Sequence, residues 1–416
     1  MIEGTPSTPR LAFTIFLPFA CGYFLSFLYR TVNAVLAPTL TADVGLTASD
    51  LGLLTSAYFL TFAAFQLPLG ALLDRFGPRR VQATLFIFAA AGAALFSVGD
   101  SLWALIAGRG LIGFGVAGGL MGSFKVITLW YPKRLWPVLN GMILGVGGIG
   151  AMTATKPVEL ALGFTDWRGI FLVLACLTVL AALFIFFAVP ERPRRSRPPA
   201  FLEQVRGFRV IFTDRLFWSV VPLTGAANGV GLGLGTLWVG PWLADVGGHD
   251  EPTVAVYLLA MTSVLTVGFF STGIIASWLD RHGFSLMKTM GTGFVIFLSG
   301  QAAITFAIDP GALWPWLIFG YFNHIGILSY PYMSGHFPPE YSGRANTALN
   351  VLTFLSAFAT QYFVGAMLDQ WPATSVGSYH PDGYFAAFGI LMILQLAAFI
   401  WFITGLKTID REKITG

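Results

Sequence analysis

The sequence contains few charged residues. Only 11% of its 416 residues are Asp, Glu, Lys or Arg, whereas 56% are hydrophobic. A soluble domain of this size carries about a quarter charged residues. The shortage therefore excludes an ordinary soluble globular protein, and the mean hydropathy of +0.73 indicates a protein embedded in a lipid bilayer.

Cysteine is scarce, and the short motifs of common catalytic and nucleotide-binding sites are absent. Cys21 and Cys176 both lie in apolar runs, so the sequence predicts no disulfide framework. No Gly-x-x-x-x-Gly-Lys-Ser/Thr loop occurs, which argues against ATP-driven transport. No Cys/His cluster has metal-ligand spacing and no nucleophile elbow appears. We therefore expect no metal, no cofactor and no enzymatic activity.

What the sequence has instead is a series of long apolar runs. A helix needs about 20 residues to cross a bilayer, so the chain has room for a dozen spans joined by short connections. The first run is too long for the apolar core of a signal peptide and leads directly into the series. The predicted spans are 11–38, 51–73, 81–99, 103–130, 138–163, 169–189, 216–244, 253–279, 289–308, 312–335, 345–368 and 384–405.

The basic residues predict the orientation of these spans. If the amino terminus is cytoplasmic, nineteen of the 24 Lys and Arg fall on the inner side, and only Arg168 falls on the outer side. This asymmetry predicts that both termini face the cytoplasm, in a multi-pass protein of a bacterial-type inner membrane. It also accounts for the net charge of +4 without nucleic acid. The remaining four cations lie inside spans: Arg30, Arg109, Lys125 and Lys156.

A basic, proline-rich stretch divides the chain. Residues 190–215 contain the run Pro-Glu-Arg-Pro-Arg-Arg-Ser-Arg-Pro-Pro, whereas the other connections are short. We interpret 1–189 as an amino-terminal half of six helices, 190–215 as a cytoplasmic linker, and 216–416 as a carboxy-terminal half of six helices.

An internal repeat supports the two halves. The loop after the second span reads Gly70-Ala-Leu-Leu-Asp74-Arg75-Phe-Gly77-Pro-Arg79, and the loop after the eighth reads Ala276-Ser-Trp-Leu-Asp280-Arg281-His282-Gly283. The small residue permits close helix approach, and the aspartate can pair with arginines or with a helix amino terminus. Positive-inside anchoring alone explains the arginines but not the paired Asp and Gly.

This loop resembles the signature of the major facilitator superfamily, and the resemblance covers essentially the whole chain. Arg109 with Gly113, Gly115 and Gly119 is similar to the family's fourth-helix motif. The resemblance implies an all-helical bundle of two pseudo-symmetric halves that rock around a central cavity, lined mainly by helices one, four, seven and ten. We expect the residues of the two repeated loops and of the fourth-helix motif to control gating. They are Gly70, Asp74, Arg75, Gly77, Arg79, Arg109, Asp280 and Arg281.

Arg30 is the leading candidate for substrate binding, and its neighbour Tyr29 is a further candidate. Arg30 follows Tyr29 well inside the first span, where an ionised side chain is costly and usually functional. The resemblance narrows here to organic-anion and sugar-phosphate permeases, which place an arginine at this point for an anionic group. A guanidinium offers a planar fork that suits carboxylate, phosphate or sulfonate. The alternative is a structural ion pair or bonding to backbone carbonyls.

The other charged groups inside spans have two interpretations each. Lys125 could contact substrate, or could extend to the nearby cytoplasmic interface. Glu159, the only carboxylate inside a span, is the candidate proton carrier. Lys156 lies one helical turn before Glu159, so an intrahelical ion pair is the competing interpretation.

The second half offers neutral polar groups. Asn228 on the seventh helix and His324 and Tyr330 on the tenth are the candidates for hydrogen bonding to substrate, with Asn323 and Tyr332 nearby. Asn346, Asn350 and Gln361 on the eleventh helix serve equally well as contacts between helices.

The sequence therefore predicts a monomeric secondary transporter of a small organic anion that works by rocker-switch alternating access with proton coupling. The partners are the solute, a proton or another coupling ion, and the lipid bilayer. The alternative is a drug or metabolite efflux proton antiporter, for which a cavity carboxylate and few cations are expected. A non-transporting receptor of the same fold is a third possibility.

Overall fold

The computed structural model describes residues 11–191, 208–374 and 378–415, and within these ranges it contains helices and no strand. Residues 192–207, the core of the predicted linker, lie outside the described part. Nine helices of the described part are long and apolar enough to cross a membrane, and Val138–Thr153 is a shorter apolar helix. Every predicted span coincides with helix. The count of twelve spans and the cytoplasmic termini stay predictions.

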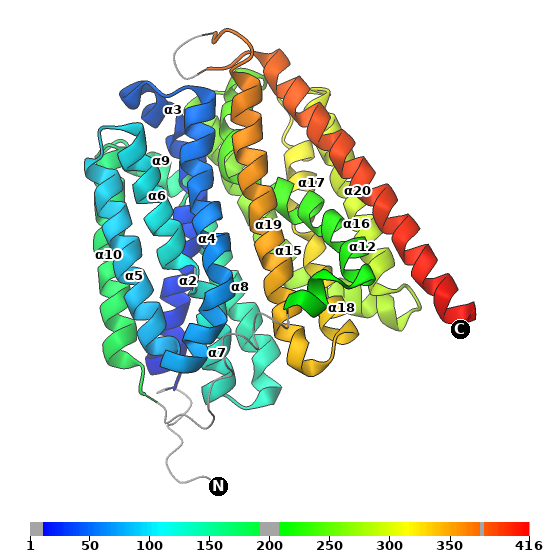
Figure 1. Ribbon diagram of the computed structural model, residues 1–416. Coiled ribbons are helices and arrows are strands. Elements are labelled where there is room, and N and C mark those ends of the chain that lie inside the picture. The colour runs from blue at the N-terminus through cyan, green and yellow to red at the C-terminus, as the bar shows by residue number, and fades with distance from the viewer. Residues whose placement is uncertain (1–10, 192–207, 375–377, 416) are drawn as a thin grey trace.

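Figure 1 shows helices α2 to α10 on one side of the molecule and α12 to α20 on the other, which we call the N-bundle and the C-bundle. The N-bundle contains α2 Leu17–Thr31, α3 Asn33–Val44, α4 Ala48–Phe76, α5 Pro78–Val98, α6 Leu102–Val116, α7 Gly119–Trp130, α8 Trp136–Thr153, α9 Lys156–Ala161 and α10 Trp167–Ala188. The C-bundle contains α12 Arg215–Thr224, α13 Val230–Gly233, α14 Val239–Asp245, α15 Glu251–Arg281, α16 Leu286–Thr305, α17 Trp314–Phe322, α18 Ser329–His336, α19 Pro339–Leu368 and α20 Pro381–Thr415.

Local sequence signals explain where the long helices begin. Thr47 and Asp50 form a reciprocal capping box at the start of α4, which satisfies backbone N–H groups that have no partner within the helix. Asp166, Asp214 and Asp250 accept hydrogen bonds from backbone amides at the starts of α10, α12 and α15. These polar caps fix the helix ends at the edges of the apolar runs.

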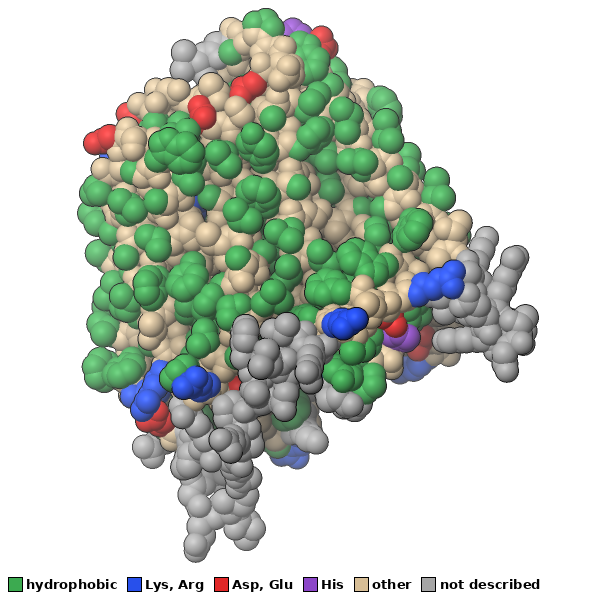
Figure 2. Space-filling model, in the orientation of Figure 1, with side chains coloured by type: hydrophobic (Ala, Val, Ile, Leu, Met, Phe, Trp, Pro, Cys, Tyr) green, Lys and Arg blue, Asp and Glu red, His purple; other side chains and the backbone are tan. Residues whose placement is uncertain are grey.

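The surface shows the arrangement expected for a bilayer. On the face in Figure 2, hydrophobic side chains cover a broad central belt, Lys and Arg gather at the lower end, and Asp and Glu are prominent at the upper end. Many large apolar side chains are exposed on the surface of the protein, including Phe187, Ile274, Ile393 and Ile400. Following the predicted orientation, we call the lower end of Figure 1 inner and the upper end outer.

The two bundles are joined most firmly at the outer end. The Asp369 carboxylate, just after α19, accepts hydrogen bonds from the backbone amides of Ala48 and Ser49 at the start of α4, both at 2.9 Å, and from the Ser49 hydroxyl. A Cβ on Gly365 would lie 2.3 Å from the Ala48 carbonyl, so α19 and α4 meet there without side chains between them. This conformation is therefore closed on the outer side.

Candidate functional site

Each of the four helices predicted to line the central cavity is interrupted within its span. The first changes at Val32 between α2 and α3, and the fourth breaks at Ala117 and Gly118 between α6 and α7. The seventh contains two π-helical turns, Gly225–Gly229 and Leu234–Trp238. The tenth contains a 3-10 turn, Ile325–Leu328. Such irregular backbone inside a membrane occurs where protein or a cavity surrounds it, and it marks functional regions.

Arg30 lies at the end of α2 and is enclosed by aromatic rings from both bundles. Its guanidinium carbon is 4.4 Å from the ring centroid of Phe27, 5.4 Å from that of Phe62 and 6.0 Å from that of Tyr58, all in the N-bundle. The ring of Phe354, on α19 of the C-bundle, is 5.2 Å away. We call these four rings the aromatic cage. They place Arg30 at the junction of the bundles.

Arg30 has no carboxylate partner among the described residues. The side chain is 6% exposed, and its Nε has no hydrogen-bond acceptor. A buried guanidinium is normally paired, because removing its charge from water is costly. The ring faces of the cage offset part of this cost through cation–π attraction. The Nε–H group is therefore a candidate donor to an anion with two oxygens, the geometry that guanidinium binds best.

Two predicted ligands of the C-bundle, Tyr330 and Asn228, have different surroundings. The Tyr330 hydroxyl donates to Asn350 Oδ1 over 3.2 Å. Asn228 Oδ1 is buried and has no hydrogen-bond partner in the described part of the chain. Of these two predicted ligands, Tyr330 is bonded to Asn350 on α19, and the buried oxygen of Asn228 has no partner among the described residues.

Tyr29 and Arg109 lie inside the N-bundle. The Tyr29 side chain is fully buried, and its hydroxyl is 2.9 Å from Thr178 Oγ1 on α10. Arg109 is 1% exposed and donates from Nη1 to the Tyr29 carbonyl over 3.0 Å, close to the change at Val32. Arg109 therefore links the fourth helix to the first at the interruption, and the Tyr29 side chain contacts α10 rather than the cage.

Lys125 pairs with the signature loop. Its Nζ is 2.6 Å from Asp74 Oδ1, and both side chains are partly exposed near the inner end. The contact joins α7, the part of the fourth span after the break at Ala117 and Gly118, to the end of α4. Lys125 is thus occupied by Asp74 in this conformation, away from Arg30.

We expect Asp74→Asn to slow turnover while leaving substrate affinity within a few-fold, because the contact joins helices and does not touch the aromatic cage. The measurement is transport rate and binding on the same purified protein. The double exchange Asp74→Lys with Lys125→Asp should recover part of the rate, since it restores the pair with reversed charges. Loss of binding in well-folded Asp74→Asn protein would refute the gating role.

Lys156 and Glu159 form the intrahelical pair that their spacing allows. Lys156 Nζ is 2.5 Å from Glu159 Oε2, and the two side chains are 25% and 18% exposed. They lie on the short helix α9, after the fifth span breaks at Ala154 and Thr155. The pair holds Glu159 next to a cation, so any proton carried by Glu159 must displace this contact.

His324 is buried between helices of the C-bundle. Its Nε2 is 3.1 Å from Thr272 Oγ1 on α15, and its ring packs 4.9 Å from that of Phe269. Phe269 in turn contacts Phe27 of the cage across the bundle junction, with ring centroids 6.1 Å apart. The Phe269 ring therefore lies between His324 and Phe27 of the cage, and His324 itself does not contact the cage.

Each of the repeated loops contains a glycine with a positive φ. Gly77 and Gly283 adopt φ values of +81° and +83°, which non-glycine residues rarely tolerate. The loops differ in their contacts. Arg79 lies over the Phe186 ring, Arg75 over Phe76, and Arg281 Nε donates to Ser277 of its own helix.

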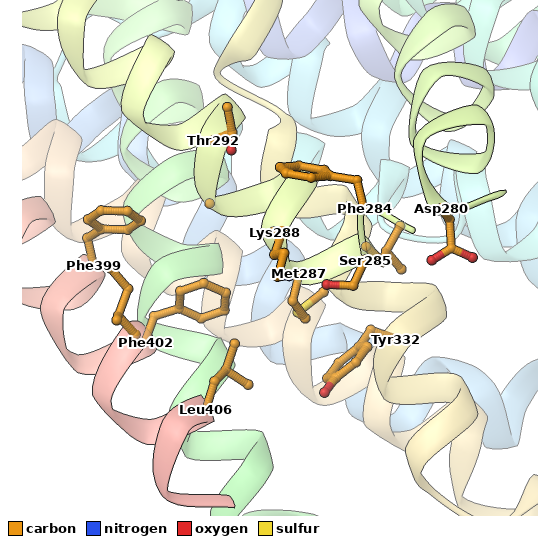
Figure 3. A pocket seen from close by; sticks show the side chains of 13 residues that line it. Asp280, Phe284, Ser285, Met287, Lys288, Thr292, Tyr332, Phe399, Phe402 and Leu406 are labelled. Atoms are coloured by element: carbon orange, nitrogen blue, oxygen red, sulfur yellow. The ribbon is translucent and has the colours of Figure 1, made fainter. Parts of the chain in front are cut away.

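Gly70 and Asp280 complete the predicted gating set. A Cβ on Gly70 would meet no atom within 4 Å, so this conformation does not use a close approach there. Asp280 has no ion-pair partner among the described residues. It borders a cavity of about 690 Å³ at the inner end of the C-bundle, together with Lys288, Phe399 and Phe402 (Figure 3). The charged pair of the N-bundle loop therefore has no counterpart in the C-bundle loop.

Sequence reasoning missed the aromatic cage. Tyr23, Phe27 and Arg30 are spaced i, i+4 and i+7, so a helical projection shows them on one face. That signal was present in the first span. Tyr58, Phe62 and Phe354 come from other helices, and no local pattern connects them to Arg30.

The long apolar helices of the described part of the chain define a polytopic membrane protein. The chain matches the model of the Major Facilitator Superfamily over residues 19–361. It belongs to that superfamily, and it is therefore a multi-pass membrane transporter rather than an enzyme.

The individual relatives share less than a third of their aligned residues with this chain. The chain is 25% identical over 305 residues to the probable sulfoacetate transporter SauU of Cupriavidus necator, covering 69% of this chain and 71% of that one. It is 29% identical over 204 residues to the uncharacterized transporter YybO of Bacillus subtilis, covering 48% and 46%. It is 26% identical over 298 residues to the MFS thioclapurine efflux transporter tcpA of Claviceps purpurea, covering 71% and 52%.

Solved structures share the fold. A bacterial homolog of the human lysosomal transporter Spinster, in an inward-facing and unoccupied conformation, superposes with a TM-score of 0.73 at 18% identity, covering 96% of each chain. A D-xylose-proton symporter superposes with a TM-score of 0.72 at 17% identity, covering 94% of this chain and 97% of that one.

Proposed function

We propose that this transporter carries a small organic anion across a bacterial-type inner membrane, and that Arg30 holds the anionic group. The observation that carries the proposal is the buried guanidinium with an unsatisfied Nε and no carboxylate partner among the described residues. An anion with two or three oxygens satisfies this edge and supplies the missing charge. The relationship to a probable sulfoacetate transporter supports this substrate class.

In the proposed cycle the N-bundle and the C-bundle, divided by the linker 190–215, act as the two rocking halves. The contacts of Asp369 with α4 hold the outer side closed, and the substrate enters or leaves on the inner side. Tyr330 and Asn228 of the C-bundle bind the end of the substrate that carries no charge, since they supply neutral donors and acceptors. Lys125 takes part through its pair with Asp74.

We further propose proton coupling, with Glu159 and its partner Lys156 as the titrating pair. A proton that reaches Glu159 from the outer side breaks the 2.5 Å contact and frees Lys156. This release couples protonation to movement of α9, which packs against α3 and α15.

Drug or metabolite efflux by proton antiport is the second candidate, and the relationship to a thioclapurine efflux transporter favours it. A site for lipophilic cations requires a carboxylate at the bundle junction. The described residues place an unpaired arginine there instead.

A thermal-shift screen of the purified protein tests the proposal. The panel contains mono- and dicarboxylates, sugar acids, phosphates and sulfonates including sulfoacetate, with lipophilic cations as the opposing set. Binding to the folded state alone raises the melting temperature, so we expect at least one anion class to stabilise the protein in a concentration-dependent way. Stabilisation by the cations and by no anion would favour efflux.

A further inference from the structure

Four aromatic rings contact the Arg30 guanidinium, and one of these rings comes from the opposite bundle. Phe27, Tyr58 and Phe62 approach the guanidinium from the N-bundle, and Phe354 approaches from the C-bundle. The Phe62 and Phe354 rings also contact one another, with centroids 4.2 Å apart. Four rings thus occupy the faces around a cation that no carboxylate neutralises in the described part of the chain.

This arrangement bears on how the carrier returns without cargo. A carrier whose buried arginine needs an anion for compensation reorients readily only when loaded, and so exchanges one anion for another. A carrier whose arginine is compensated when empty also reorients unloaded, and so performs net transport. We infer that the aromatic cage, closed by Phe354, lets the empty carrier cross between its two states, so that this protein catalyses net transport rather than obligatory exchange.

Phe354 is the decisive ring because it belongs to the other bundle. Rings of the N-bundle stay with Arg30 whichever side is open, since they move with it. The Phe354 contact exists only while α19 lies against α4, as it does when the bundles close on each other. Cation–π attraction at a desolvated site therefore favours closure of the empty carrier. Phe354 is therefore a positioning residue for the step in which the empty carrier reorients. Its ring carries no charge and no hydrogen-bond donor, so it does not replace the substrate's contacts with Arg30.

The inference rests on the proposed role of Arg30, and its first test requires no substrate. In detergent-purified, anion-depleted protein, Phe354→Leu should lower the melting temperature. In the Arg30→Met background the same change should have much less effect, because the cation is gone. Such a double-mutant cycle isolates the interaction between two side chains. Phe59→Leu is the matched control, since Phe59 lies on α4 and contacts Phe354 at 5.8 Å but is not among the four rings over Arg30.

The second test separates net transport from exchange in proteoliposomes with radiolabelled sulfoacetate. Wild-type protein should accumulate radiolabelled sulfoacetate in vesicles that contain no anion substrate at the start. Phe354→Leu should slow this net uptake by about two- to thirtyfold, the span of rates that cation–π energies correspond to. Counterflow into vesicles preloaded with unlabelled sulfoacetate should fall much less, and Phe354→Trp should restore net uptake, because it replaces the ring.

The outcomes are distinct. Equal destabilisation by Phe354→Leu with and without Arg30 overturns the inference, and so does an equal loss of net uptake and counterflow. A wild-type protein that exchanges sulfoacetate but does not fill empty vesicles overturns it as well. Failure to move sulfoacetate in either assay contradicts the proposed function for that anion, while the thermal cycle still decides whether the cage stabilises the empty carrier.

Discussion

Arg30→Ala is expected to lower the affinity for the transported anion by roughly 30-fold to several thousandfold, and to abolish uptake at low substrate concentration. Truncating one partner of a buried, hydrogen-bonded charge pair typically costs about 2–5 kcal/mol, much of it from the charge left without compensation. The measurement is isothermal titration of the anion that stabilises wild-type protein in the thermal-shift screen. Monodispersity and melting temperature establish that the variant is folded.

Two further variants sharpen the result. Arg30→Lys keeps the charge but loses the planar fork, so its affinity should fall between that of wild type and that of Arg30→Ala. Lys125→Ala should bind almost normally, because Lys125 contacts Asp74 rather than the aromatic cage. Near-wild-type affinity in Arg30→Ala would leave Arg30 as a structural residue and make neutral-solute or drug transport the better account.

Asp369→Ala is expected to open the outer side. The carboxylate accepts two backbone hydrogen bonds at the start of α4, where the helix dipole favours negative charge, and it also accepts from Ser49. A hydrogen bond to a charged group contributes about 1.5–3 kcal/mol, so its loss should shift the equilibrium towards the outward-open state by roughly tenfold or more.

The reporter for this shift is a cysteine at Ala34, which is buried at the outer junction where α3 meets Gly240 of the C-bundle. In a background with Cys21→Ala and Cys176→Ala, a membrane-impermeant thiol reagent should label Ala34→Cys several times faster when Asp369→Ala is present. Asp100→Ala serves as the control, since Asp100 pairs with Arg168 inside the N-bundle. Equal labelling rates in the Asp369 and Asp100 variants would show that Asp369 does not hold the outer side.

The fold was predictable because a bilayer restricts sequence so strongly. Each of the twelve predicted ranges coincides with helix, and the repeated Asp-Arg-x-Gly loops share a left-handed glycine at Gly77 and Gly283. The interruptions were less visible. Glycines beside the break at Ala117 and Gly118 pack closely against other helices, but glycine inside an apolar run does not by itself indicate whether the helix continues.

In the candidate site, contacts within one helix were predictable from the sequence, and contacts between distant segments were not. The pair of Lys156 with Glu159 depends on spacing within one helix, so the sequence offered it directly. Lys125 and Asp74 are both apparent in the sequence, but their contact joins positions 51 residues apart. Arg30 was identified from its depth in the span. Its contact with Phe354 depends on how α19 packs against α4, which only the three-dimensional structure specifies.

The central claim is that Arg30 makes this protein a carrier of organic anions, and transport into proteoliposomes tests it most directly. Radiolabelled sulfoacetate is offered to vesicles that contain wild-type protein, Arg30→Ala or Lys125→Ala, with a lipophilic cation offered in parallel. The account predicts saturable sulfoacetate uptake by wild type and Lys125→Ala, none by Arg30→Ala, and no movement of the cation. Cation transport that persists in Arg30→Ala, with no sulfoacetate uptake by wild type, would contradict it.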